Sequence, residues 1–97
     1  MNIDVTIRHI ELSDKLQQAA RDKAAKLGDS FPSIESVKVV LDQDGPNYQA
    51  SVDVQGGRQM NASASHRDTD AAGTLAAAFD KAQAQLRKLA DKRDAVR

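Results

Sequence analysis

The sequence predicts an α+β fold with the element order β-α-β-β-β-α, in which both helices pack on one face of a four-stranded sheet. Four segments alternate apolar and polar residues with the period of a half-buried strand, and two segments repeat apolar residues at helical spacing. Each strand segment is apolar on one side only. The simplest burial therefore places both helices over that side and leaves the other side of the sheet in water.

The chain begins with a predicted strand and a predicted helix. The strand runs from Asn2 to His9, because its apolar residues recur at every second position. The helix runs from Asp14 to Leu27, with Ser13 as its candidate N-cap and Gly28 as the residue that ends it. The apolar positions of these two elements are Ile3, Val5, Ile7, Leu16, Ala20, Ala24 and Leu27.

Three more strands follow, and two turns join them. An Asp-Gly-Pro-Asn turn at Asp44 to Asn47 predicts the first hairpin. We expect the pair Gly56-Gly57 to supply the positive φ that a second tight turn needs. The inward-facing residues of these strands are Val37, Val39, Leu41, Tyr48, Ala50, Val52, Val54, Met60, Ala62 and Ala64. The three strands should therefore form an antiparallel meander.

A long second helix follows the last strand. Either Thr69 or Asp70 can cap its start, after a polar segment, His66-Arg67-Asp68, that we interpret as a loop. The helix should reach Asp91 or beyond. Its apolar stripe consists of Leu75, Phe79, Ala82, Leu86 and Leu89.

The composition sets limits on what this chain does. With 97 residues it fits a single domain, 1–97, and its one Tyr and two Phe predict a thin aliphatic core. The absence of Cys excludes disulfides, thiolate metal sites and thiol catalysis. No segment approaches the roughly 20 apolar residues of a membrane span, and no secretion signal is recognisable. We therefore expect a cytoplasmic protein that does not bind a membrane.

The sequence gives little support for catalysis or for a metal or cofactor site. Nucleophilic mechanisms need a base that a third group orients, and only two His are present, with no pattern that joins them. There is no His pair at helical spacing and no Asp-rich calcium loop. We predict that the protein is not an enzyme, holds no metal or cofactor and takes no small-molecule substrate.

Basic residues concentrate on the two predicted helices, although the net charge is zero. Residues 58–97 carry eight Lys or Arg against five Asp or Glu, whereas residues 29–57 carry one against five. At 100° per residue, the lysines of the second helix share one sector and its aspartates fall on the other flank of the apolar stripe. One basic edge from each helix could form a continuous strip suited to RNA phosphates, or the helices could simply be solvated faces. With so few aromatic residues, an RNA surface here would contact folded RNA through its backbone.

Several segments resemble one known family in order and spacing over nearly the whole chain. They are Ile3-Asp4-Val5-Thr6, Asp22 to Leu27, Gly56-Gly57 with Ala62-Ser63-Ala64, and Asp80-Lys81 with Gln85 to Leu89 and Lys92. The family is that of the bacterial ribosome hibernation-promoting factors, also known as ribosome-associated inhibitors or sigma-54 modulation proteins. The resemblance implies a fold similar to double-stranded-RNA-binding domains. It also implies a translation inhibitor that occupies the messenger and transfer RNA region of the small ribosomal subunit under stress or in stationary phase.

The resemblance also implies which residues contact ribosomal RNA. Carried over by matching position, they are Lys23, Lys26, Lys81, Lys88 and Lys92, with Arg67 as a further candidate. Two positions depart from the common family pattern, where Ala72 replaces an aromatic residue and Ala84 replaces a basic one. The alternative function is a protein-interaction module that binds a regulatory partner, such as a transcription factor, through the bare polar face of the sheet.

Overall fold

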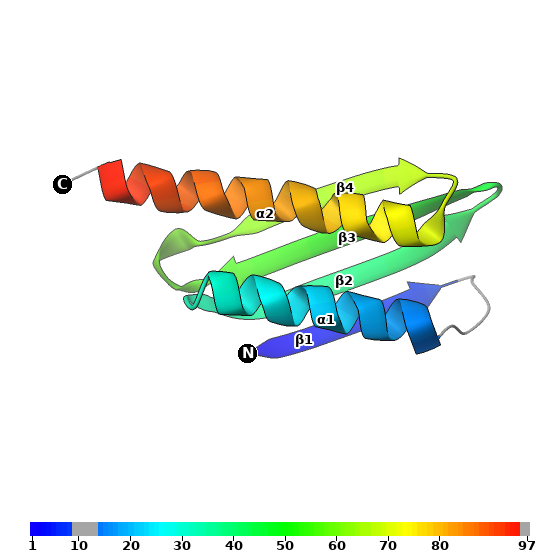
Figure 1. The fold of residues 1–97 in the computed structure, drawn as a ribbon, viewed down its shortest axis with the longest axis horizontal. Helices are drawn as coiled ribbons and strands as arrows, with labels where there is room; N and C mark the ends of the chain where they lie inside the picture. Colours follow the sequence, from blue (N-terminus) through cyan, green and yellow to red (C-terminus); the bar gives the residue numbers. More distant parts are fainter. Residues whose placement is uncertain (9–13, 96–97) are drawn as a thin grey trace.

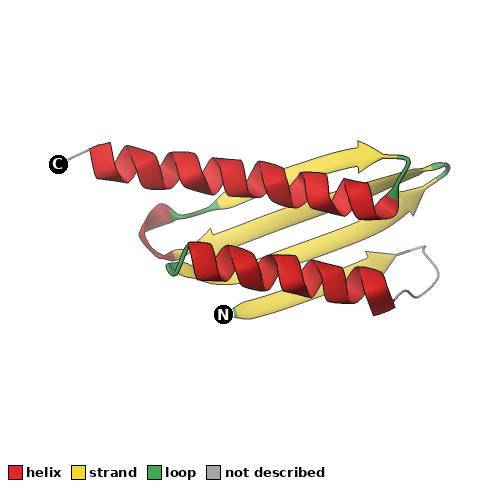
Figure 2. Ribbon diagram, viewed as in Figure 1, coloured by secondary structure: helices red, strands yellow, loops and turns green. Residues whose placement is uncertain are grey.

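The protein folds into one sheet layer and one helix layer, as the sequence predicts (Figures 1 and 2). A computed structural model describes residues 1–8 and 14–95, with side chains up to Asp91. The elements are β1 (Asn2–Arg8), α1 (Asp14–Ser30), β2 (Ile34–Asp44), β3 (Asn47–Gly56), the short 3₁₀ helix η1 (Gly57–Gln59), β4 (Ala62–Asp68) and α2 (Ala71–Ala95). His9 and the predicted cap Ser13 lie outside the described residues.

The strands form one mixed sheet in the order β1-β2-β3-β4. β1 pairs with β2 in parallel, whereas β2 with β3 and β3 with β4 are antiparallel. Because parallel neighbours need a crossover connection, α1 joins β1 to β2 across one face of the sheet. α2 returns over the same face, so both helices cover it, as Figure 1 shows. The predicted element order, meander and one-sided helix layer are confirmed.

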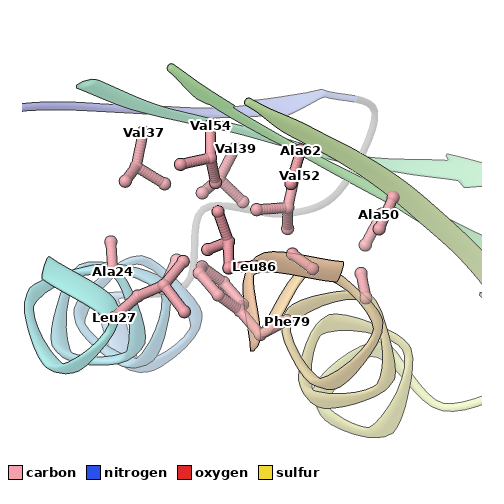
Figure 3. Close-up of a cluster of buried hydrophobic side chains, with 14 of the residues drawn as sticks. Ala24, Leu27, Val37, Val39, Ala50, Val52, Val54, Ala62, Phe79 and Leu86 are labelled. Carbon is pink, nitrogen blue, oxygen red and sulfur yellow. The ribbon is translucent and has the colours of Figure 1, made fainter. Parts of the chain in front are cut away.

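The core lies between the helices and the two central strands. Val39 and Val52 are 0% exposed, and Leu86 of α2 is equally buried against them. Leu27 of α1 and Phe79 of α2 point toward each other between the helices (Figure 3). Small and branched aliphatic side chains therefore supply nearly all the apolar burial, which agrees with the thin core expected from the composition.

α1 is longer than the sequence predicts, because Gly28 does not end it. The helix continues to Ser30, and the Phe31 N–H still donates to the Leu27 carbonyl at 3.0 Å. A Cβ at Gly28 would lie 2.5 Å from the Met1 sulfur, at the far end of a flexible side chain that is 56% exposed and can move aside. The expectation that this glycine stops the helix was wrong, because the helical hydrogen bonding continues past it and an interior glycine costs a helix only about 1 kcal/mol.

The Gly56-Gly57 pair does not supply a positive φ; Gly56 instead permits close packing of the backbone. Gly56 is extended (φ −146°), and the residues with positive φ in this turn are Arg58 and Gln59, at 58° and 64°. A Cβ on Gly56 would lie 2.8 Å from the Ser33 carbonyl oxygen. The glycine therefore allows two backbone segments to approach, and the prediction of a positive φ here was wrong.

β4 differs from its prediction at both ends. It begins at Ala62, so the buried Met60 precedes it, and it continues through His66, Arg67 and Asp68, for which the sequence predicts a loop. The cause is the length of β3, whose first residues provide ladder partners: Tyr48 pairs with Asp68. α2 then starts after Asp70, whose carboxylate accepts the Gly73 N–H at 2.7 Å. Of the two predicted caps, Asp70 is the one used.

Candidate nucleic-acid interface

The buried stripe of α2 fixes the direction of its charged side chains. Leu75, Ala82 and Leu86 are at most 1% exposed, so they face the sheet and set the rotation of the helix. Lys81 consequently lies on the flank above β4, and Asp80 lies on the flank toward α1. The predicted separation of lysines and aspartates on this helix is confirmed for these two residues.

A groove of about 260 Å³ runs between the two helices. The residues that line it are Lys23, Lys26, Leu27 and Ser30 of α1 with Phe79, Asp80 and Gln83 of α2. Lys26 is exposed and Lys23 is half-buried, so the α1 wall carries two ammonium groups. The α2 wall contributes one carboxylate, from Asp80. The groove therefore has a net positive lining with apolar side chains between its walls.

The other flank of α2 is tied to the edge of β4. The Gln85 side-chain amide donates to the Ser63 carbonyl at 2.8 Å, and the Ser63 N–H donates back to Gln85 Oε1 at 3.2 Å. The Lys81 ammonium donates to the Ser65 carbonyl at 3.2 Å. These bonds substitute for a neighbouring strand, and Lys81 keeps an exposed ammonium with further donors for a phosphate. The role of Gln85 had no signal in the sequence, because nothing local links it to Ser63.

The structure brings some of the predicted contact residues together and separates others. Lys23 and Lys26 line one groove, whereas Lys81 lies on the far flank of α2 and Lys88, two turns further along, is exposed on the same side. The two basic edges do not form the continuous strip that we considered, because α2 turns its acidic flank toward α1. The side chain of Lys92 is outside the described part of the structure.

Arg67 lies apart from Lys23, Lys26, Lys81 and Lys88. Because side chains alternate along β4 and Ala64 is buried, Arg67 points to the face of the sheet that has no helices. Its guanidinium pairs with Asp44 at 2.9 Å, and both side chains are more than half exposed. An exposed pair of this kind contributes little stability.

The bare sheet face is polar and of mixed charge, as predicted. A wide, shallow hollow in it is lined by Glu35, Lys38, Asp53, Ser63 and neighbouring residues. The Ser63 hydroxyl donates to Asp53 at 2.6 Å. Acidic and basic groups alternate here, so this face lacks the concentration of positive charge found on the helix side.

His66 and Asp68 provide no sign of a reactive centre. Their closest side-chain N and O atoms are 3.7 Å apart, and Asp68 is exposed. The Thr69 N–H, which donates to this carboxylate, lowers the pKa of Asp68 below its ordinary value, and His66 adds to the effect. Among the residues that the structure describes, no three His, Cys, Asp or Glu side chains are grouped to hold a metal, and no helix is apolar enough to span a bilayer.

Comparisons with known proteins agree with this architecture. Residues 3–94 match the family described as Sigma 54 modulation protein / S30EA ribosomal protein. A ribosomal subunit interface protein from Coxiella burnetii has the same fold, with a TM-score of 0.82, 16% identity, and coverage of 94% of this chain and 99% of that one. The Protein Y N-terminal domain of Thermus thermophilus gives a TM-score of 0.78 at 25% identity, covering 92% of this chain and 99% of that one. A search of curated proteins found no match. Since the family match spans nearly the whole sequence, the chain belongs to the Sigma 54 modulation protein / S30EA ribosomal protein family.

Proposed function

We propose that this protein is a ribosome-binding translation inhibitor that promotes ribosome hibernation under stress or in stationary phase. The observation that carries the proposal is the family match over residues 3–94. The Coxiella burnetii protein with the same fold is described as a ribosomal subunit interface protein, which is compatible with an action on the ribosome. The partner would be the small ribosomal subunit and its RNA, in the cytoplasm, with no cofactor and no turnover.

The mechanism that we propose is occlusion. A bound protein of this size would fill the region of the small subunit where messenger and transfer RNA lie, and so prevent initiation. Affinity would come from phosphate contacts, which position a protein on RNA without reading its sequence. This suits a surface with few aromatic side chains available for stacking.

The contact surface that we propose is the helix layer. Lys23 and Lys26 form one positive group at the interhelical groove, and Lys81 and Lys88 form a second on the far flank of α2. Since a helix with its side chains is about 10–12 Å across, the two groups would reach phosphates on separate stretches of folded RNA. Asp80 between them would disfavour a phosphate directly in the groove, so register along the RNA would depend on both groups.

A matched pair of charge reversals on α1 tests the surface. Lys26→Glu reverses a charge at the groove, while Arg21→Glu makes the same change on an exposed residue that lies well round the helix from Lys23 and Lys26. Lys26→Glu should weaken binding to purified small subunits and relieve inhibition of cell-free translation. Arg21→Glu should retain most of both activities.

Salt dependence supplies an independent readout. For each phosphate that a variant no longer neutralises, the slope of log affinity against log salt should fall by about 0.7 to 0.9. Lys26→Glu should therefore flatten the slope, and Arg21→Glu should leave it unchanged. If the parent neither binds small subunits nor inhibits translation, the proposed function is wrong. If it does both and neither variant changes them, the α1 side of the groove is not a contact, and the far flank of α2 and the bare sheet face become the surfaces to examine.

A further inference from the structure

The two edges of the sheet differ in whether their outward backbone groups have hydrogen-bond partners among the described residues. At β4, the side chains of Gln85 and Lys81 occupy backbone groups of Ser63 and Ser65, so α2 closes that edge. At the opposite edge, no strand of the described chain pairs with the outer side of β1. An open edge of this kind is a template for pairing with another strand.

The open edge also leaves an apolar row incompletely covered. Ile3, Val5 and Ile7 point to the helix side and pack against the core, but each stays only partly buried. The alternate residues Asp4 and Arg8 are exposed on the bare face, with Thr6 between them. Within the described residues, β1 therefore presents an outer edge that no strand pairs with, an apolar row on one face and two opposite charges on the other.

We infer that two copies of this chain associate through their β1 strands, paired antiparallel about a two-fold axis at Thr6. In this register, Val5 lies opposite the partner's Ile7, and these two side chains gain the cover that they lack in one copy. Asp4 lies opposite the partner's Arg8, and the two-fold axis generates this pair twice. Opposite charges directly across neighbouring strands stabilise their pairing.

The charges of the inner strands continue the same pattern. Within one copy, Asp53 lies opposite Lys38, and Lys38 lies opposite Asp4. Arg8 likewise lies opposite Asp42. Across the proposed junction, the row on the bare face therefore reads Asp53, Lys38, Asp4, the partner's Arg8 and the partner's Asp42. The sign alternates at every step, including the step between the two copies.

The neighbouring antiparallel register lacks this match. Centred on Val5, it places Asp4 opposite the partner's Thr6 and Ile3 opposite the partner's Ile7, so neither charge of β1 meets an opposite charge. The outer-face charges therefore select the register centred on Thr6. This inference is independent of ribosome binding, because it uses the edge and the bare face of the sheet and not the helix layer.

Two substitutions of Thr6 test the register as well as the association. Thr6→Lys and Thr6→Asp each place like charges opposite each other at the two-fold axis, so each variant alone should be monomeric where the parent dimerises. An equimolar mixture of the two should dimerise again, because Lys then faces Asp. The readout is sedimentation equilibrium up to about 1 mM protein, since a small interface gives weak association.

Ser65→Lys is the matched control. Ser65 lies in the same cross-sheet row as Thr6, through Val40 and Ser51, but on β4 at the closed edge. This variant should dimerise like the parent, and circular dichroism should show that all variants keep the fold. A parent that is monomeric throughout the range overturns the inference. A Thr6→Lys variant that associates more tightly than the parent also overturns it, because that result identifies the register in which residue 6 meets Asp4.

Discussion

Truncation of Leu86 provides the sharpest test of the helix layer. This side chain is 0% exposed and lies between α2 and the valines of the central strands (Figure 3). Leu86→Ala removes its outer carbons and leaves a cavity, and fully buried Leu→Ala changes cost about 2.7–5.0 kcal/mol. Val39 and Val54 on the facing strands are stiff, branched side chains on a hydrogen-bonded sheet, so they can close little of this space. We therefore expect a loss of about 3–5 kcal/mol.

That loss is large compared with the stability of a chain of this length. Domains of this kind unfold with about 5–15 kcal/mol, so Leu86→Ala should remove about a fifth or more of the total. At roughly 4–8 °C per kcal/mol, the thermal midpoint should fall by more than about 10 °C. Lys88→Ala, only two positions further on the same helix but exposed, should change stability by no more than about 0.5 kcal/mol.

Urea unfolding followed by far-ultraviolet circular dichroism measures both variants against the parent. The midpoint should shift strongly for Leu86→Ala, while the slope with denaturant stays the same, because the surface exposed on unfolding changes little. Equal midpoints for the two variants would show that α2 is not rotated with Leu86 toward the sheet. The positions given above for the charged side chains of this helix would then be wrong as well.

Three other predictions concern α2 and its surroundings. Replacing Lys88 and Lys92 together by Glu should abolish inhibition of cell-free translation without lowering the thermal midpoint, and full inhibition by this variant would exclude the far flank of α2 as a contact. Gln85→Leu should speed amide hydrogen exchange at Ser63 and cost about 1 kcal/mol, since water replaces the side-chain amide at an exposed edge; unchanged exchange would show that the edge is not held by this side chain. The Asp68 carboxyl should titrate with a pKa below its ordinary value of 3.8 by carbon-13 NMR, because it accepts the backbone N–H that follows it. Since this pKa is lowered in the folded state, the ionised group favours folding above the unfolded-state pKa, and the contribution is lost as the pH falls through the folded-state pKa.

Local sequence patterns were sufficient to predict the elements and the layers. The alternation at Val37, Val39 and Leu41 fixed which side of β2 is buried, because a strand places successive side chains on opposite faces. The spacing of Leu75 and Leu86 did the same for α2. These patterns act over a few residues, so they could be recognised without knowledge of the tertiary structure.

The roles of the two glycine positions could not be predicted in this way. Gly28 has a sequence context that favours a helix stop, yet the helix runs through it to Ser30. Gly56 has a context that favours a tight turn with positive φ, yet it is extended and lets the Ser33 backbone come close. A glycine allows both unusual φ and close approach, and only the position of the distant segment decides which property is used.

The sequence by itself determined the order of the elements, their buried sides and the family resemblance, because each depends on the type and spacing of neighbouring residues. Only the tertiary structure decided that Lys23 and Lys26 share a groove with Asp80, that Gln85 closes the β4 edge, and that Arg67 points to the opposite face. The reason is physical: the direction of a side chain relative to another element depends on how each helix is rotated on the sheet. That rotation is set by the packing of the whole core and by no single segment.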